Sequence, residues 1–230
     1  MSADAPAGPG TDRRTFLRWS GLSVAGAVAA GCGQEPPHGE RVVSLDFGRD
    51  GDVAVVNYLL VVQEVEAAFY EHVLAAPPHG FAAEELQVFG EIAAHERAHR
   101  GFLRAKLGDR AIGPVATHFA DVDLHSHEDV LHTAERIETL GVEALNGAAQ
   151  YVTLDGPLGL EPLTAVGEIV SVEARHAATV ADLRRAHRAT DEFAPRAFDA
   201  AKTPEDVLDE VSTFLSTLVP LIGLPPAEET

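Results

Sequence analysis

Two Glu-x-x-His motifs are the residues of this sequence best suited to chemistry: Glu96 with His99, and Glu173 with His176. On a helix, residues three apart lie on the same face, so the carboxylate and the imidazole of each motif can reach one metal ion. Carboxylate and imidazole ligands together suit iron or manganese, and zinc less well. The motifs therefore predict a metal site that holds one or two ions.

The position of the motifs, rather than their presence, indicates a metal site, since chance alone yields about one Glu-x-x-His in a chain of this composition. A third copy, residues 35–38, contains two prolines and cannot be helical. Glu96 and Glu173, by contrast, interrupt apolar stripes of helical spacing, formed by Phe89, Ile92 and Leu103 and by Val166, Ile169 and Val180. A carboxylate on such a stripe is buried, and burial is unfavourable unless the group is paired, protonated or metal-bound.

Single carboxylates interrupt two further stripes, Glu66 in the first long segment and Glu138 in the third. A divalent cation between the four carboxylates would relieve their mutual repulsion. Tyr70, one turn beyond Glu66, is a candidate hydrogen-bond donor to a ligand. Gln63, one turn before Glu66, offers only a neutral amide, which is a poor substitute for a carboxylate ligand. No residue is assigned a catalytic role.

Helix start and stop signals divide the chain into segments long enough to carry these stripes. Gly108 ends one helix, and Ser126 and Thr203 are suited to cap the starts of two others. The helices expected span about residues 52–75, 82–107, 127–153, 161–188 and 204–218. No strand-like alternation of comparable length competes with them. The prediction is an all-α four-helix bundle with an additional C-terminal helix over residues 51–220, followed by a disordered tail at 221–230.

Composition limits the partners of this domain. The 230 residues are 46% hydrophobic, enough for one well-buried core. With 17 Lys and Arg against 36 Asp and Glu, the formal charge is −19, so the surface repels nucleic acid, which is not expected as a partner. The single cysteine, Cys32, excludes an internal disulfide and a cysteine-rich zinc or iron–sulfur site.

The N-terminus has the features of an export signal. Arg13 and Arg14, followed by the small apolar segment Gly21–Gly31, resemble a twin-arginine signal peptide covering residues 1–31. The apolar segment is too short and too rich in alanine to span a bilayer permanently. Export to the cell envelope is therefore expected.

The only cysteine lies directly after this signal. Ala29-Ala30-Gly31-Cys32 resembles a bacterial lipoprotein processing site, which implies a lipid thioether on Cys32 and anchorage to a membrane. The alternative is an ordinary signal peptide cut near Ala30, with a periplasmic or extracytoplasmic product. Residues 32–50, rich in proline and glycine, are then expected to be the anchor cysteine and a flexible tether.

Five segments carry a resemblance to a known family, and they cover roughly residues 52–190. They are Asn57-Tyr58-Leu59-Leu60, Glu66-Ala67-Ala68-Phe69-Tyr70, Glu96-Arg97-Ala98-His99, Ile137-Glu138-Thr139-Leu140-Gly141-Val142 and Glu173-Ala174-Arg175-His176. These segments resemble the ferritin-like family that includes plant desiccation-related proteins. The resemblance implies a four-helix bundle with a non-haem metal pair, whose ligands by position are Glu66, Glu96, His99, Glu138, Glu173 and His176.

One position departs from the family, because Gln63 stands where a glutamate is usual. The resemblance therefore leaves open whether one ion or two are bound. It implies an exported metal-binding protein with iron or manganese and oxidase-type or peroxide-detoxifying chemistry. The alternative is a non-catalytic cell-envelope protein of stress protection that keeps a vestigial metal site. A homodimer is compatible with either function.

Overall fold

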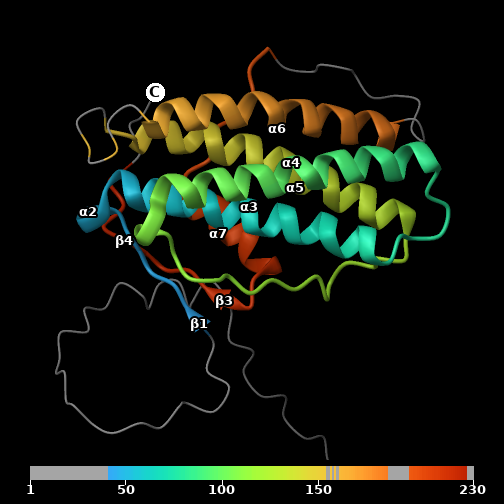
Figure 1. Cartoon of the computed structure of the whole chain (residues 1–230), viewed down its shortest axis with the longest axis horizontal. Coiled ribbons are helices and arrows are strands. Elements are labelled where there is room, and N and C mark those ends of the chain that lie inside the picture. The colour runs from blue at the N-terminus through green and yellow to red at the C-terminus, as the bar shows by residue number, and fades with distance from the viewer. Residues whose placement is uncertain (1–40, 154–155, 157, 159–160, 186–196, 227–230) are drawn as a thin grey trace, which may run out of the picture. The chain divides into compact units, whose positions relative to one another are not determined.

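Four long helices form the domain in the computed structural model, which describes residues 41–153, 156, 158, 161–185 and 197–226. They are α3 (Asp52–Ala75), α4 (Ala83–Leu107), α5 (His127–Ala148) and α6 (Glu161–Arg185), as Figure 1 shows. The closest packing is between α3 and α4 and between α5 and α6, while α3 also contacts α5 and α4 contacts α6. The predicted all-α four-helix bundle with an additional C-terminal helix is confirmed.

The predicted caps set the ends of these helices. The Ser126 hydroxyl accepts a hydrogen bond from the Asp129 backbone N–H at 3.2 Å, and Gly108 ends α4 with a φ of 54°. The resulting helix positions turn the predicted apolar stripes toward the interior. Their buried members include Leu59, Val73, Phe89, Ile92, Leu103, Leu131, Ala134, Leu145, Val166, Ile169 and Val180.

The helix α3 is apolar around nearly its whole circumference and lies in the core. Among the described helices it alone is long and apolar enough to span a membrane, but 83% of that window is buried inside the domain. Its first residue, Asp52, is fully buried and accepts hydrogen bonds from the backbone N–H and the hydroxyl of Thr153, at 2.8 and 3.0 Å. These bonds hold the start of α3 against the chain that follows α5.

The fifth helix is shorter than predicted. Helix α7 (Pro204–Val211) is followed by a 3-10 turn at Ser212–Phe214, and the chain then becomes extended in β3 (Thr217–Leu218). The third helix likewise ends at Ala148 and continues only as a 3-10 turn to Tyr151. In both cases the last turn tightens, which satisfies terminal carbonyls that have no partner further along the helix.

Part of the predicted tether and of the predicted tail is ordered, contrary to expectation. The strand β1 (Arg41–Val42) pairs in parallel with β3, and β2 (Leu45–Asp46) pairs in parallel with β4 (Leu221–Ile222). A short helix, α2 (Phe47–Asp50), follows β2, and the side chains of Leu45 and Phe47 are buried. Burial of these apolar groups, together with backbone hydrogen bonds to the C-terminal segment, orders residues that proline and glycine content alone assigned to a tether.

Several predicted features lie outside the described residues. They are the signal peptide at 1–31, Cys32 and the following residues to 40, the last predicted turn of the fourth helix at 186–188, and the end of the tail at 227–230. The position of these segments therefore enters none of the structural arguments below.

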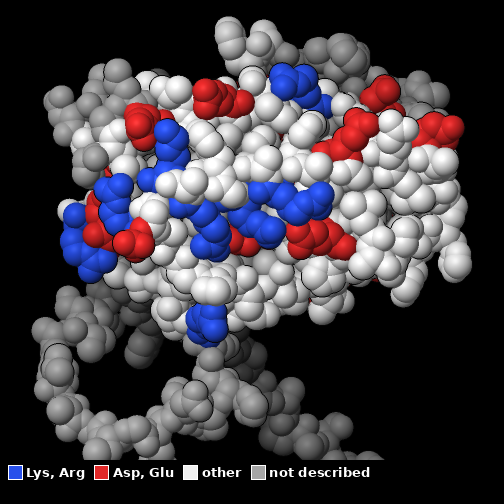
Figure 2. Space-filling model, viewed as in Figure 1, with Lys and Arg blue, Asp and Glu red and all other residues white. Residues whose placement is uncertain are grey.

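One face of the domain carries a band of Lys and Arg side chains interspersed with Asp and Glu (Figure 2). Ion pairs join neighbouring helices, as between Arg104 of α4 and Glu64 of α3 and between Lys106 of α4 and Glu161 of α6. Exposed pairs of this kind contribute only about 0–1 kcal/mol each, so the apolar core supplies most of the stability of the bundle.

Candidate metal centre

The polar interruptions of the four apolar stripes meet inside the bundle. The residues are Gln63, Glu66 and Tyr70 from α3, Glu96 and His99 from α4, Glu138 from α5, and Glu173 and His176 from α6. The four glutamates are all 0% exposed and His176 is 4% exposed. The structure thus brings together every residue that the sequence predicted for the site.

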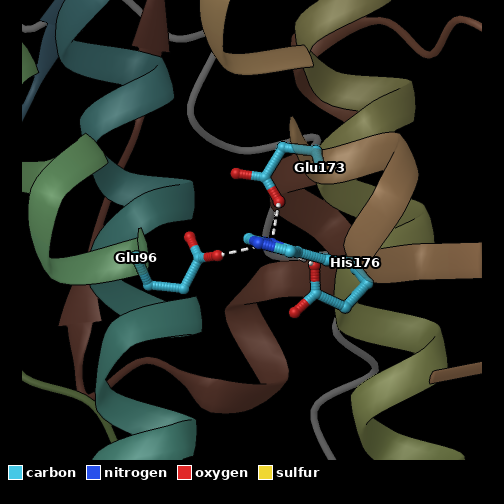
Figure 3. Close-up of side chains that lie close together, drawn as sticks. Glu96, Glu173 and His176 are labelled. Carbon is cyan, nitrogen blue, oxygen red and sulfur yellow. Dashed lines mark ion pairs between the residues drawn. The ribbon is translucent and has the colours of Figure 1, made fainter. Parts of the chain in front are cut away.

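Four of these side chains converge on one point, and we call them the ligand cluster: Glu96, Glu138, Glu173 and His176. One ligand atom from each lies within 4.8 Å of the others, and no other such group of acidic and histidine side chains occurs among the described residues. Figure 3 shows Glu96 and Glu173 directed at the His176 ring from two sides.

In the ligand cluster, one imidazole nitrogen faces oxygens of three carboxylates. The Nδ1 atom of His176 lies 2.9 Å from an oxygen of Glu96, 3.4 Å from one of Glu173 and 3.5 Å from one of Glu138. A single N–H can donate to one of these oxygens well, but not to all three. A divalent cation between the nitrogen and the oxygens would serve all four atoms at once.

Buried polar atoms without a hydrogen-bond partner are concentrated here. Among the described residues they include Glu66 Oε1, both oxygens of Glu96, Glu138 Oε2, Glu173 Oε2, His99 Nδ1 and His176 Nδ1. Each such atom would destabilise the fold by about 1–3 kcal/mol if it stayed unsatisfied. A shared cation would satisfy most of them, so the donor set fits a metal ion.

Burial and mutual repulsion oppose full ionisation of the carboxylates. Burial raises the pKa of Glu66 well above its ordinary value, and the charges of Glu173 and Glu96 raise it further. Burial also raises the pKa of Glu138 to about 8, although its hydrogen bond with His176 opposes the change. The metal-free cluster therefore keeps protons that a cation would replace.

The pKa values of His99 and His176 are raised, whereas burial alone would lower the pKa of an imidazole. Burial lowers the pKa of His176, but close contacts with three surrounding carboxylates outweigh burial and raise the pKa to about 12. The same balance raises the pKa of His99 to about 9. Burial raises the pKa of Glu173, but close contacts with His176 and His99 lower it to about 2. Without metal, Glu173 is thus the ionised partner of two imidazolium groups.

Three of the four remaining predicted residues adjoin the ligand cluster on one side, which we call the amide side: Gln63, Glu66 and His99. The amide nitrogen of Gln63 donates to Glu66 Oε2 and, at 2.8 Å, to Glu173 Oε1. Nδ1 of His99 lies 3.0 Å from the same Glu173 oxygen. Glu173 therefore belongs to both sides, with Oε1 on the amide side and Oε2 facing His176.

Tyr70 and Gly141 position two of the carboxylates. The buried Tyr70 hydroxyl donates to Glu138 Oε1 at 2.5 Å, so that Oε2 of the same carboxylate faces His176. Burial and the nearby Glu138 charge raise the pKa of Tyr70, which therefore stays a donor. At Gly141, a Cβ atom would lie 2.2 Å from Glu66 Oε1, so a residue without a side chain leaves the space that this carboxylate occupies.

His95 is a contact that the sequence analysis did not assign. Its ring stacks on that of His176 with an interplanar angle of 8°, and its Nδ1 lies 2.9 Å from His176 Nε2. If Nδ1 of His176 binds a metal, Nε2 carries the proton and donates it to His95, which fixes the tautomer. His95 lies off the apolar stripe of α4, so only the packing of α4 on α6 reveals its role.

Comparison with known proteins agrees with this geometry. A family described as the ferritin-like domain matches residues 51–186 of the chain. The match covers more than half of the sequence and includes every residue of the ligand cluster and the amide side. No curated protein matches the chain.

Proposed function

Because the chain belongs to the ferritin-like domain family, we propose that its ligand cluster holds a divalent metal ion, iron or manganese. The observation that carries the proposal is the convergence, within 4.8 Å, of four buried donor atoms from three helices. Three carboxylates and one imidazole form an oxygen-rich set, which favours iron or manganese over zinc.

Each member of the cluster has a distinct position around the proposed ion. Glu96 and Glu138 approach from α4 and α5, and Glu173 and His176 approach together from α6. Tyr70 orients Glu138 through its hydroxyl, and the apolar residues of the four stripes exclude bulk water. Excluding water strengthens the attraction between the carboxylates and the cation.

We propose redox chemistry with a small oxygen species as reactant. When bound, iron or manganese supplies oxidase-type or peroxide-consuming activity. The glutamates are fully buried and the side chain of His99 is only 12% exposed. A small molecule such as dioxygen or peroxide can therefore reach the site more easily than a large organic substrate. Oxygen uptake and peroxide consumption by the metal-loaded protein test this; neither is expected from the metal-free protein.

A second candidate function is non-catalytic stress protection in the cell envelope, as in desiccation-related proteins. The observation in its favour is that Gln63 supplies a neutral amide between two carboxylates. The same assays separate the two functions, because a metal-loaded protein that consumes neither oxygen nor peroxide would support the second and contradict the first.

Replacing His95 with alanine should weaken metal binding while leaving the metal-free fold nearly unchanged. The exposed His95 accepts the proton of His176 Nε2 in the metal-bound form, and loss of such outer partners typically lowers metal affinity about 10–100-fold. A metal titration measures the effect, with His95→Gln expected to restore part of the affinity. His79→Ala, in the exposed loop after α3, is the control; equal affinity in the His95 and His79 variants would contradict this role.

We further propose that the protein is exported by the twin-arginine route and anchored by a lipid on Cys32. The support is the sequence pattern alone, because these residues lie outside the described part of the chain. Cys32→Ser should move the protein from the membrane fraction to the soluble envelope fraction; unchanged fractionation would contradict the anchor. A homodimer stays a prediction, which the mass of the protein in solution tests.

A further inference from the structure

The amide of Gln63 lies beside the ligand cluster, between the carboxylates of Glu66 and Glu173. The side chain is 1% exposed, and its nitrogen donates to Glu66 of α3 and to Glu173 of α6. Glu173 is ionised and can only accept hydrogen bonds, so the amide presents its nitrogen rather than its oxygen to this carboxylate. The hydrogen bond to Glu173 therefore fixes the orientation of the amide.

This nitrogen takes the place between two carboxylates where a bridging cation would lie. In dimetal bundles, carboxylates from facing helices share the ions between them. Here both hydrogens of a neutral NH₂ group join the two glutamates. Nδ1 of His99 also lies 3.0 Å from Oε1 of Glu173, so two nitrogens, one from Gln63 and one from His99, surround this oxygen.

The two sides of the site therefore differ in what they can still bind. Within the described structure, the atoms Glu96 Oε1, Glu138 Oε2, Glu173 Oε2 and His176 Nδ1 are buried without hydrogen-bond partners. The amide side also has buried atoms without partners, among them Glu66 Oε1 and His99 Nδ1, but there Glu66 Oε2 and Glu173 Oε1 are joined through the Gln63 NH₂ group. A cation there would have to displace the NH₂ group and break its two hydrogen bonds to carboxylates, and from Gln63 it would gain at most one neutral amide oxygen.

Little room is left for the amide side to rearrange. Glu66 Oε1 lies where a Cβ of Gly141 would be, with 2.2 Å between the two positions. The carboxylate is thus packed directly against the backbone of α5. The packing of α3 against α5 therefore restricts the movement of this carboxylate.

We infer that the Gln63 amide substitutes for a second cation, so that each chain holds one metal ion, bound by the ligand cluster, with Glu66 and His99 outside its coordination. The inference rests on the proposed function, since it specifies the capacity of the same site. It resolves the choice between one ion and two in favour of one, and it identifies Gln63 as the residue that determines the number.

Manganese loading of the purified protein tests the inference. The wild-type protein should retain about one Mn²⁺ per chain after desalting and give the hyperfine sextet of an isolated ion in electron paramagnetic resonance. Gln63→Glu replaces the donor with a carboxylate ligand and should retain about two, with the multiline signal of a coupled pair. Gln87→Glu makes the same chemical change at an exposed position of α4 and should behave as wild type.

The outcomes separate this inference from the proposed function. Two coupled ions in the wild-type protein would overturn the inference and leave the proposed function standing. A folded Gln63→Glu variant that retains only one ion would also overturn it. No retained manganese or iron in the wild-type protein would overturn the proposed function itself. If Gln63→Glu does not fold, the wild-type count and spectrum decide alone.

Discussion

Replacing Glu173 with glutamine is expected to remove tight metal binding, with a loss in affinity of more than about 100-fold, since outer partners alone are worth about 10–100-fold. Glu173 contacts both histidines, as Glu96 does, through Oε1 to His99 and Oε2 to His176, and its Oε1 also accepts from Gln63. Glutamine keeps the size of the side chain but removes its charge and one of its two acceptor oxygens. Isothermal titration with Mn²⁺ or Fe²⁺ measures the loss.

Glu143→Gln is the matched control for this variant. Glu143, on α5, is likewise a buried glutamate of the bundle at 9% exposed, but its carboxylate pairs with Lys202 at 2.8 Å rather than with the ligand cluster. Its replacement should leave metal affinity unchanged. An affinity for Glu173→Gln equal to that of Glu143→Gln would show that the buried cluster is not the metal site.

The metal-free protein is expected to lose stability as pH rises from about 5 to 9. The pKa of Glu138 is about 8 in the fold against an ordinary 4.5, so ionisation of this buried group destabilises the fold increasingly across that interval. The pKa values of His99, about 9, and His176, about 12, also lie above the ordinary 6.5. Their stabilisation is complete below 6.5 and is lost as pH rises through the folded values, so all three groups act in one direction.

Glu173 changes the stability in the opposite direction, but only at a pH below the interval from 5 to 9. Its pKa is lowered from 4.5 to about 2, so its stabilisation is present above 4.5 and is lost only as pH falls toward 2. A loss of roughly 3 kcal/mol between pH 5 and 9, which is about what the shift of His99 alone would give, would lower Tm by about 6–12 °C in a chain of this size. Thermal unfolding of chelator-treated protein at several pH values measures it.

Bound metal should abolish this dependence or reverse it. The ligands must be deprotonated to bind a cation, so higher pH favours the metal-bound fold. Adding Mn²⁺ is therefore expected to raise Tm more at pH 8 than at pH 5. A Tm of the metal-free protein that stays constant or rises from pH 5 to 9 would contradict the charge arrangement described for the cluster.

The site residues that lie on the apolar stripes could be predicted, because helix periodicity determines which residues share a face. Glu66, Glu96, Glu138 and Glu173 each interrupt an apolar stripe, and a residue on a stripe must point into the bundle. Local signals such as Ser126 and Gly108 also set the helix ends closely. These inferences require only contacts within one helix.

Features that depend on how helices pack against one another could not be predicted. The neutrality of Gln63 was evident from sequence, but its double hydrogen bond depends on the rotation of α3 relative to α6. The stacking of His95 on His176 depends likewise on the packing of α4 on α6. The pairing of β2 with β4 joins the two ends of the domain, and two-residue strands have no periodicity to detect.

Anomalous diffraction from crystals of the manganese-loaded protein tests the central claim most directly. A map collected at the manganese absorption edge should show one strong peak at about 2.0–2.4 Å from atoms of Glu96, Glu138, Glu173 and His176. No peak is expected between Gln63 and Glu66. A cluster without a peak, or manganese bound only at the acidic surface, would contradict the claim that this bundle is built around a metal ion.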